Sequence, residues 1–435
     1  MIHLSKILLF SYITLVFINC QQTKNKSENN QIPNAQYENL APSYIKGIHE
    51  TQSLYYKNKS KPIIEKLNVL NGIDVLLEKK LHFIKSRKIA LVTNHSGVDK
   101  NSIPNYKRLM EVEDVELKVI FSPEHGLFGE SEAGEKINYS DIDELPRVIS
   151  LYGGTRKPSA EMLEDVNLII YDIQDIGARF YTYISTLGMV MEAAAELDIP
   201  VLVLDRPNPI RGDIIEGPLL DIKHQSFVGY YPIPTRYGGT VGELANKIIE
   251  NKWISPHPEL EVIKMEGWQS NAWYDQTDLP WIPPSPNIPD LKTAIIYPGM
   301  CLFEGTNISE GRGTPNPFKW IGAPWIDRKK LSQTLNNFKL PGVVFVPKSF
   351  TPIRIPGKSE NPKFKDQKCN GIEVWITDRD KYKSIDVGVL TLYTIYNMYP
   401  DKIKIRESGL NRLWGSNTLY EKLTRGVTAQ DILKY

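Results

Sequence analysis

Polar side chains gather at four places in the first half of the chain, each directly after a short apolar run. These places are residues 93–95 (Thr-Asn-His), 122–126 (Ser-Pro-Glu-His-Gly), 172–175 (Asp-Ile-Gln-Asp) and 205–208 (Asp-Arg-Pro-Asn). In open parallel sheets, ligands bind in the crevice outside the carboxyl ends of the strands. Loops are polar for other reasons too, but four such segments in succession favour a common site. The sequence therefore predicts that carboxylates, amides, imidazoles and an arginine surround one crevice.

Carboxylates are the best supplied of the reactive groups. Those in glycine-, proline- or aromatic-rich segments are Glu124, Glu130, Asp172, Asp175, Glu304 and Glu310. Glycoside cleavage needs two such groups, because one acid protonates the leaving oxygen while a second carboxylate activates water or attacks the anomeric carbon. Paired acids are also common in structural ion pairs, so composition alone does not choose this reaction.

Nucleotide chemistry lacks its motifs. No G-x-G-x-x-G follows the first apolar run, so a dinucleotide site is not expected. The triplet at residues 357–359 (Gly-Lys-Ser) looks like the end of a phosphate-binding loop, but Pro352 stands where the first glycine is required. We therefore expect no nucleotide cofactor.

Metal chemistry stays open as an alternative. There is no H-E-x-x-H motif, and we expect no metal. His95, His125, Asp172 and Asp205 are nevertheless residue types that bind divalent metals, and folding could bring them together. A metal-dependent hydrolase is thus a second candidate.

The elements that must position these residues have an α/β pattern. Short, continuous apolar runs at 88–92, 117–121, 168–171 and 201–204 are typical of strands buried on both faces of a parallel sheet. A helical pattern at 182–197 ends just before the last of them, as a crossover between parallel strands requires. The pattern predicts a Rossmann-like domain over 66–211.

A second, smaller α/β domain is expected over 212–435. From Gly212 the sequence becomes rich in proline, glycine and tryptophan. Thr240 and Glu243 have capping-box spacing, so we assign Glu243 to a helix start rather than to catalysis. Strand-like runs at 343–346 and 371–376 and a helical run at 388–399 follow. We expect the active site in the cleft between the two domains.

The N-terminus has the pattern of an export signal. Lys6 precedes an apolar run over 7–18 that is too short to span a membrane, and this run ends at Cys20. We expect residues 1–20 to be a lipoprotein signal peptide, Cys20 to be the lipidated residue and 21–65 to be a polar tether. The alternatives to lipidation are an ordinary cleaved signal peptide and an uncleaved anchor. The expected location is the periplasmic side of the outer membrane.

Charge and cysteine content narrow the partners. A net charge of +1, with 41% hydrophobic and 24% charged residues, gives no electrostatic reason to expect nucleic acid. Cys301 and Cys369 are too few for a disulfide scaffold, although an oxidising compartment would allow them to pair. We expect two unrelated buried thiols.

Five longer strings resemble those of the NamZ-type exo-β-N-acetylmuramidases. They are residues 91–97 (LVTNHSG), 121–129 (FSPEHGLFG), 172–183 (DIQDIGARFYTY), 204–210 (LDRPNPI) and 303–314 (FEGTNISEGRGT), in this order. The resemblance implies a glycoside hydrolase of peptidoglycan turnover and cell-wall recycling. It implies release of non-reducing-terminal N-acetylmuramic acid (MurNAc) from fragments such as MurNAc-GlcNAc, a Rossmann-like domain, a second α/β domain and an active site between them.

The family's catalytic glutamate falls on Glu124, which we interpret as the general acid; its alternative is a turn cap or a partner of His125. The second carboxylate stays open among Asp172, Asp175, Glu304 and Glu310. A substrate-assisted path, in which the acetamido oxygen of MurNAc attacks, is also open.

Substrate-binding candidates come from the same strings. Arg179, Arg206 and Arg312 are candidates for the lactyl carboxylate of MurNAc, with structural ion pairs as their alternative. Tyr181 and Tyr183 are candidates for stacking on the sugar, or for core packing. The remaining candidates are Asn94, His95, His125, Asn208 and Asn307. The rival function from another class is a lipid-anchored protein that binds muropeptides or sugars without cutting them, which would have little need for Glu124.

Overall fold

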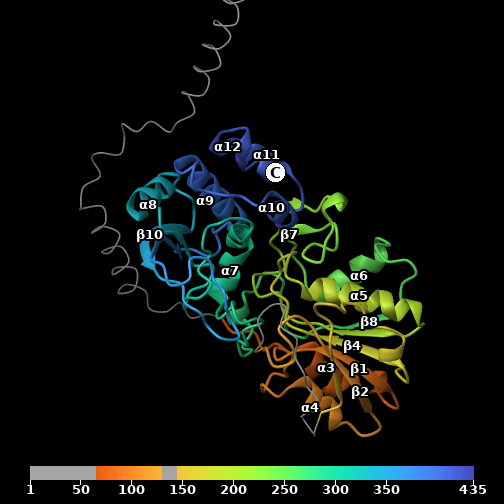
Figure 1. The fold of residues 1–435 in the computed structure, drawn as a ribbon. Helices are drawn as coiled ribbons and strands as arrows, with labels where there is room; N and C mark the ends of the chain where they lie inside the picture. Colours follow the sequence, from red (N-terminus) through yellow and green to blue (C-terminus); the bar gives the residue numbers. More distant parts are fainter. Residues whose placement is uncertain (1–64, 130–144) are drawn as a thin grey trace, which may run out of the picture. The chain divides into compact units, whose positions relative to one another are not determined.

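A six-stranded parallel sheet is the framework of the first half of the chain (Figure 1). The structure is a computed structural model that describes residues 65–129 and 145–435. The strands are β1 (Lys88–Thr93), β2 (Glu116–Ser122), β3 (Arg147–Ser150), β4 (Leu168–Asp172), β5 (Val201–Leu204) and β8 (Leu260–Ile263). Their order, β3-β2-β1-β4-β5-β8, with every pair parallel, is the doubly wound order of Rossmann folds. The predicted fold class is confirmed.

Helices cover both faces of this sheet because its central strands are apolar on both sides. Leu91 and Ile170 point to one core, and Val92 and Tyr171 point to the other; all four are fully buried. The bordering helices are α3 (Gly72–Lys79) and α4 (Asn105–Met110) on one face and α5 (Tyr183–Glu196) and α6 (Val241–Glu250) on the other (Figure 1). Short 3₁₀ segments add η3 (Leu81–Phe83), η4 (Glu161–Leu163), η5 (Ile222–His224), η6 (Tyr274–Gln276) and η7 (Cys301–Gly305).

The parallel sheet includes a strand that lies beyond the first apolar runs of the sequence. We placed the start of the second domain at Gly212, but β8 hydrogen-bonds to β5 and completes the first sheet at Ile263. Between them, β6 (Glu216–Leu219) and β7 (Pro234–Arg236) form a separate antiparallel pair. The capping box at the start of α6 is confirmed, because Thr240 Oγ1 accepts from the Glu243 amide at 3.2 Å and Glu243 Oε2 accepts from the Thr240 amide at 3.0 Å.

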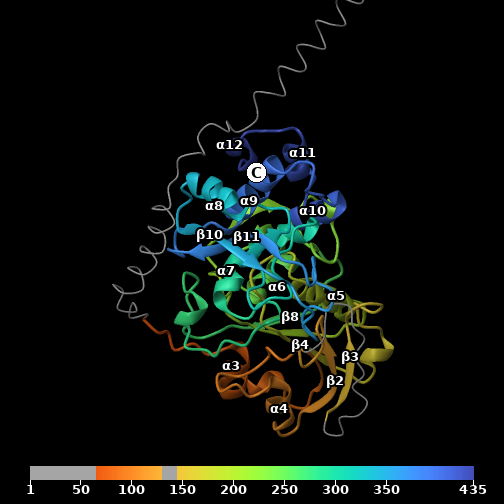
Figure 2. The same ribbon diagram turned by 60° about the vertical axis from the view of Figure 1, so that its left-hand side comes forward.

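A smaller antiparallel sheet with helices forms the second part. Its strands β9 (Trp320–Ala323), β10 (Val343–Phe350) and β11 (Cys369–Ile376) have the order β10-β11-β9. The helices are α7 (Leu291–Met300), α8 (Arg328–Asn337), α9 (Ser384–Met398), α10 (Glu407–Trp414), α11 (Thr418–Thr424) and α12 (Ala429–Ile432). Helix α8 packs on β10 and β11, and α7 packs on α9 (Figure 2). The predicted second α/β part is confirmed, although its sheet is antiparallel.

One apolar core joins the two parts. A single cluster of buried side chains extends from Ala90 in β1 to Ile432 in α12. Cys301 and Cys369 are both buried and unpaired, as expected for unrelated thiols. In the part of the chain that the structure describes, no helix is both long and apolar enough to cross a bilayer. The export signal, Cys20 and the tether lie outside the described residues, except for Glu65.

Candidate active site

The turn after β2 presents Glu124 and His125 to a cavity of about 490 Å³. The amide of Gly126 donates to the Pro123 carbonyl at 3.1 Å, which closes a tight turn. His125 has φ 72° and Gly126 has φ 73°, so two successive residues adopt the left-handed conformation. This conformation is uncommon for a residue with a side chain, and such residues concentrate at functional sites. The turn is thus held in a form that aims its side chains at the cavity.

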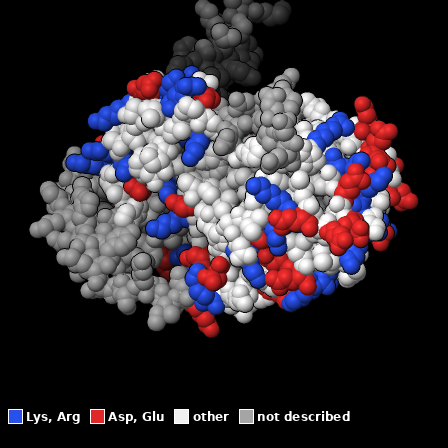
Figure 3. Space-filling model, turned by 90° about the horizontal axis from the view of Figure 1, so that it is seen from below, with Lys and Arg blue, Asp and Glu red and all other residues white. Residues whose placement is uncertain are grey.

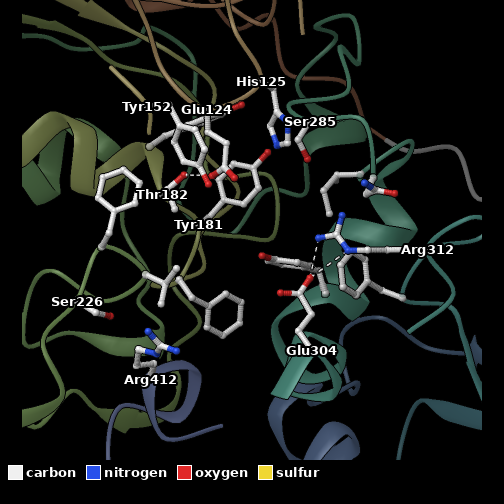
Figure 4. Close-up of a pocket in the computed structure, with 18 of the residues that line it drawn as sticks. Glu124, His125, Tyr152, Tyr181, Thr182, Ser226, Ser285, Glu304, Arg312 and Arg412 are labelled. Atoms are coloured by element: carbon white, nitrogen blue, oxygen red, sulfur yellow. Dashed lines mark hydrogen bonds and ion pairs between the residues drawn. The ribbon is translucent and has the colours of Figure 1, made fainter. Parts of the chain in front are cut away.

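The cavity is built from both parts of the chain (Figure 4). The first part contributes the turn after β2, the segment after β3, the residues that lead into α5 and the turn at 226–228. The second part contributes the segment before α7, α7 itself, η7, the loop after it and α10. The lining residues are Glu124, His125, Tyr152, Arg156, Phe180, Tyr181, Thr182, Tyr183, Ser226, Phe227, Val228, Ser285, Asn287, Ile288, Tyr297, Glu304, Arg312, Phe318 and Arg412.

Two hydroxyl groups hold the Glu124 carboxylate. The Thr182 hydroxyl donates to Glu124 Oε2 at 2.6 Å, which is the length expected for a bond to a charged acceptor (Figure 4). Thr182 is the residue directly before α5, so the helix start fixes the position of this donor. The Tyr152 hydroxyl also bonds to Glu124, and burial together with this carboxylate raises the pKa of Tyr152 well above its ordinary value. Tyr152 therefore stays a hydrogen-bond donor at neutral pH.

Glu304 lies across the cavity from Glu124 (Figure 4). Its Oε1 accepts two bonds from Arg312, at 2.6 Å from Nη2 and 3.2 Å from Nε. Glu310 lies behind this pair, with 5% of its side chain exposed, and bonds to Lys363 Nζ at 2.9 Å. Among the described residues, Glu124 and Glu304 are the two carboxylates that line the cavity. Of the four candidates for the second carboxylate, the structure brings Glu304 to the site and places Glu310 outside its lining.

Aromatic rings form one wall. Tyr181 meets Tyr183 edge to face with ring centroids 4.8 Å apart, and Tyr297 meets Phe318 in the same way, also at 4.8 Å. Phe180 contacts Tyr297 at 5.4 Å. Such edge-to-face packing holds each ring in a defined orientation. Tyr181 and Tyr183 thus pack against each other and also line the cavity, and their stacking on the sugar stays a prediction.

Asp172 and Arg206 do not line the cavity. They form an ion pair in the protein interior, with Arg206 Nε 2.5 Å from Asp172 Oδ1 and side chains 2% and 0% exposed. Arg206 also donates to the Val98 carbonyl at 2.9 Å, and Asn105 donates to Asp172 Oδ2 at 2.8 Å. Each group has its partners within the protein, so both strand-end residues have a structural role here.

Asp175 is also directed away from the cavity lining. Its Oδ2 accepts from the Gly177 amide at 2.7 Å and from the Tyr237 hydroxyl at 2.5 Å. Burial raises the pKa of Asp175 to about 6, against the lowering effect of these two bonds. A raised pKa often marks a functional acid, but it also occurs in structural networks, and here the geometry indicates the latter.

Asn94 and His95 support the cavity from behind. Asn94 Nδ2 donates to the Tyr183 hydroxyl at 2.9 Å, and this hydroxyl donates to the Pro284 carbonyl at 2.7 Å. His95 Nε2 lies 2.7 Å from the Pro283 carbonyl, and since a carbonyl only accepts, Nε2 must carry the proton. These bonds position the proline-rich segment that supplies Ser285 to the cavity wall.

The remaining candidates for substrate binding have structural partners. Arg179 is fully buried and donates to the carbonyls of Pro218, Ile233, Leu413 and Trp414 at 2.7–3.1 Å, which ties the first part to the end of α10. Asn208 donates to the Gly239 carbonyl at 2.8 Å. Asn307 exchanges bonds with Lys402 and Lys404 at 2.9 and 2.8 Å. None of these three is part of the cavity lining in the described chain.

Metal binding gains no geometric support within residues 65–129 and 145–435, where no three His, Cys, Asp or Glu side chains form a ligand cluster. Asp205 instead accepts from the Thr240 hydroxyl at 2.7 Å and from the Gly242 amide at 2.9 Å. The face drawn in Figure 3 shows acidic and basic side chains interspersed.

Several lining residues were not predicted from sequence, including Tyr152, Arg156, Thr182, Ser285 and Arg412. Thr182 had a usable signal, since it stands at a predicted helix start next to two candidate tyrosines. Arg412 had none, because an arginine on an amphipathic helix is ordinary.

Known families match nearly all of the chain from residue 89 onward. The family model described as "Exo-beta-N-acetylmuramidase NamZ, N-terminal" matches residues 89–292, and the C-terminal model of the same name matches residues 295–435. The chain belongs to the NamZ family. This confirms the resemblance of the five strings, and the enzyme is thus a glycoside hydrolase that acts on peptidoglycan.

Relatives of this NamZ-family chain cover most of its length. The peptidoglycan beta-N-acetylmuramidase NamZ of Bacillus subtilis (strain 168) is 42% identical over 371 residues, which are 85% of this chain and 87% of the relative. Two solved structures of DUF1343 family proteins from Bacteroides fragilis NCTC 9343 are similar. The first has a TM-score of 0.77 and 36% identity and covers 84% of this chain and 94% of its own. The second has a TM-score of 0.67 and 33% identity, with coverage of 84% and 93%.

Proposed function

We propose that this enzyme releases MurNAc from the non-reducing ends of peptidoglycan fragments such as MurNAc-GlcNAc, with Glu124 as the general acid. This proposal rests on the position of Glu124, which lies on the wall of the cavity and is held by the Thr182 and Tyr152 hydroxyls. The name of the Bacillus subtilis relative, a peptidoglycan beta-N-acetylmuramidase, supports the choice of sugar. A cavity of about 490 Å³ is in the range of sites for one small ligand, which favours action at a chain end.

The hydroxyl partners of Glu124 suit an acid that becomes charged during the reaction. As the glycosidic oxygen departs, it takes the proton of Glu124, and negative charge develops on the carboxylate. A donor already aimed at Oε2, such as Thr182, bonds more strongly to the charged form and so stabilises the transition state. Because Thr182 sits at the fixed start of α5, no reorganisation is needed at that moment.

Glu304 is the second carboxylate of the proposed mechanism. Arg312 binds Oε1 and fixes the orientation of the group. Glu304 then acts on the far side of the sugar from Glu124, either by activating water, by attacking the anomeric carbon, or by steadying the acetamido group in a substrate-assisted path. The stereochemistry of the released MurNAc, followed by proton NMR, separates the inverting route from the two retaining ones.

The location of the enzyme is a further part of the proposal. Lys6, the apolar run at 7–18 and Cys20 favour export and lipidation at Cys20, with the enzyme on the periplasmic side of the outer membrane. Peptidoglycan lies outside the cytoplasmic membrane, so export suits the substrate. Labelling of cells with a fatty-acid analogue should modify the wild type and not Cys20→Ala; equal labelling of both, or of neither, rejects lipidation at this residue.

The test of function compares leaving groups. Glu124→Gln keeps the shape of the side chain but removes the acid. General acid catalysis contributes about 10²- to 10⁴-fold, so we expect a loss of this size on MurNAc-GlcNAc and a much smaller loss on an aryl MurNAc glycoside, whose phenolate leaves without protonation. Glu111→Gln, an exposed glutamate next to α4, is the matched control and should be fully active.

Each outcome has a distinct meaning. No MurNAc release by the wild type from either substrate would reject the proposed activity. Equal losses on both substrates would assign Glu124 to another role, such as base or nucleophile. Near-normal cleavage of the disaccharide by Glu124→Gln would remove Glu124 from the chemistry.

A further inference from the structure

Two arginines on the rim of the cavity lack carboxylate partners in the described part of the chain. Arg156 and Arg412 both line the cavity and are exposed, and neither forms an ion pair there. The third cavity arginine, Arg312, differs because it is bonded to Glu304 at 2.6 Å. The site therefore holds two positive charges that its described residues do not neutralise.

Both arginines flank the turn at 226–228. The Arg156 guanidinium lies over the Phe227 ring, 4.4 Å from its centroid, which fixes its plane. Arg412 is on α10, and its Nε donates to the Ser408 carbonyl at 3.1 Å. Within residues 65–129 and 145–435, its two terminal nitrogens form no hydrogen bond. Figure 4 shows Arg412 next to Ser226, on the opposite side of the cavity from Arg312. Arg156 and Arg412 thus both lie next to the turn at 226–228, whereas Arg312 is paired with Glu304.

The chemistry of the proposed substrate supplies a matching anion. MurNAc differs from GlcNAc by a lactyl ether that ends in a carboxylate, and a guanidinium binds a carboxylate with two parallel hydrogen bonds. A neutral sugar would give neither guanidinium an ionic partner in the cavity. We propose that Arg412, with Arg156 beside it, binds the lactyl carboxylate of MurNAc; this rests on the proposed function.

A peptide stem on MurNAc would change the contact with Arg412 and Arg156. In peptidoglycan that carries stems, the lactyl carboxylate is bound in an amide and has no charge. Arginines on the exposed rim then lose their ionic partner, although the stem itself has room to leave toward solvent. Arg412 and Arg156 should therefore contribute less to cleavage of a MurNAc that carries a stem than to cleavage of one with a free lactyl carboxylate.

The test varies the protein and the substrate together. Arg412→Ala and Arg156→Ala are assayed on an aryl β-MurNAc glycoside and on the same glycoside with its lactyl carboxylate converted to a methylamide. Loss of one charge-assisted bond at an exposed position should lower kcat/KM about 10-fold on the free acid. On the methylamide the variants should equal the wild type. Arg425→Ala, an exposed arginine after α11 that pairs with Glu421, is the matched control.

The outcomes separate this inference from the proposed function. Wild-type enzyme that fails to cleave the MurNAc glycoside rejects the function itself. If the wild type is active but each arginine variant loses as much activity on the methylamide as on the free acid, the arginines have a structural role and the inference is overturned. A larger loss on a MurNAc–peptide glycoside than on the free acid would show that stem carboxylates are the ligand, and would also overturn it. Partial recovery by Arg412→Lys supports recognition of charge.

Discussion

Replacement of Thr182 by valine tests how Glu124 is prepared for proton donation. Valine has nearly the same shape as threonine, but a methyl group takes the place of the hydroxyl that donates to Glu124 Oε2 at 2.6 Å. Thr182 is 8% exposed, so water does not readily replace this donor. The bond strengthens as Glu124 loses its proton, and its removal should therefore raise the barrier of the chemical step more than it weakens binding.

The size of the effect follows from the kind of bond. A hydrogen bond to a charged group contributes about 1.5–3 kcal/mol, and each 1.36 kcal/mol changes a rate tenfold. For a short and largely buried contact, kcat on MurNAc-GlcNAc should fall about 10- to 150-fold with KM little changed. On an aryl glycoside the loss should be smaller, because protonation of the leaving group contributes less there.

Steady-state kinetics of Thr182→Val, Glu124→Gln and the double variant provide the assay. If Thr182 acts through Glu124, the double variant should be no slower than Glu124→Gln alone. Thr182→Ser keeps the hydroxyl and should stay within a few-fold of the wild type. An unchanged kcat for a folded Thr182→Val, or losses that multiply in the double variant, would refute this reasoning.

Three further predictions concern other carboxylates and their partners. Glu304→Gln should lose activity about equally on disaccharide and aryl substrates, measured by kcat, because its proposed role does not depend on the leaving group; a loss confined to the disaccharide would contradict this. Arg206→Met leaves Asp172 buried without its counter-charge and should lower the free energy of unfolding in urea by about 3–5 kcal/mol, whereas a change below about 1 kcal/mol would show that the pair is not structural. Burial raises the pKa of Asp175 from 3.8 to about 6, so between about pH 4 and 6 the folded protein retains a proton that the unfolded chain has lost, and the free energy of unfolding falls as pH rises. The free energy of unfolding, measured by urea titration at pH 4 and pH 7, should decrease by up to about 3 kcal/mol less in Asp175→Asn than in the wild type. Identical pH profiles of the two proteins would reject a raised pKa for Asp175.

The central strands were predictable because burial on both faces requires continuous apolar runs. Strands β1, β2, β4 and β5 lie within one residue of the predicted ranges at each end. Strands β3 and β8 were missed, and both lie at the edges of the sheet. Their sequences, Arg-Val-Ile-Ser and Leu-Glu-Val-Ile, mix polar and apolar residues because an edge strand is only partly buried. For the same reason, nothing in the sequence indicated that the parallel sheet continues beyond Gly212 to β8.

The site itself was predicted in part. The residues that were named from the sequence and line the cavity are Glu124, His125, Tyr181, Tyr183, Glu304 and Arg312. Other named residues follow strands in the same way but have partners within the protein, and spacing along the chain does not distinguish the two cases. Lining residues near the C-terminus could not be predicted from the sequence, because α10 is brought to the site by its packing against η7. That contact is a property of the fold, with no local signal.

The sheet also explains why this Rossmann-like fold serves a sugar rather than a nucleotide. In doubly wound sheets the ligand lies where the strand order reverses, here between β1 and β4. That position is occupied by the ion pair of Asp172 and Arg206, with Asn105 bonded to Asp172 at 2.8 Å. A Cβ atom at Gly97 would lie 2.2 Å from Thr93 Oγ1, so the backbone after β1 also closes over this point. With the usual crevice filled, the cavity forms one strand away, after β2, where Glu124 faces the second part of the chain.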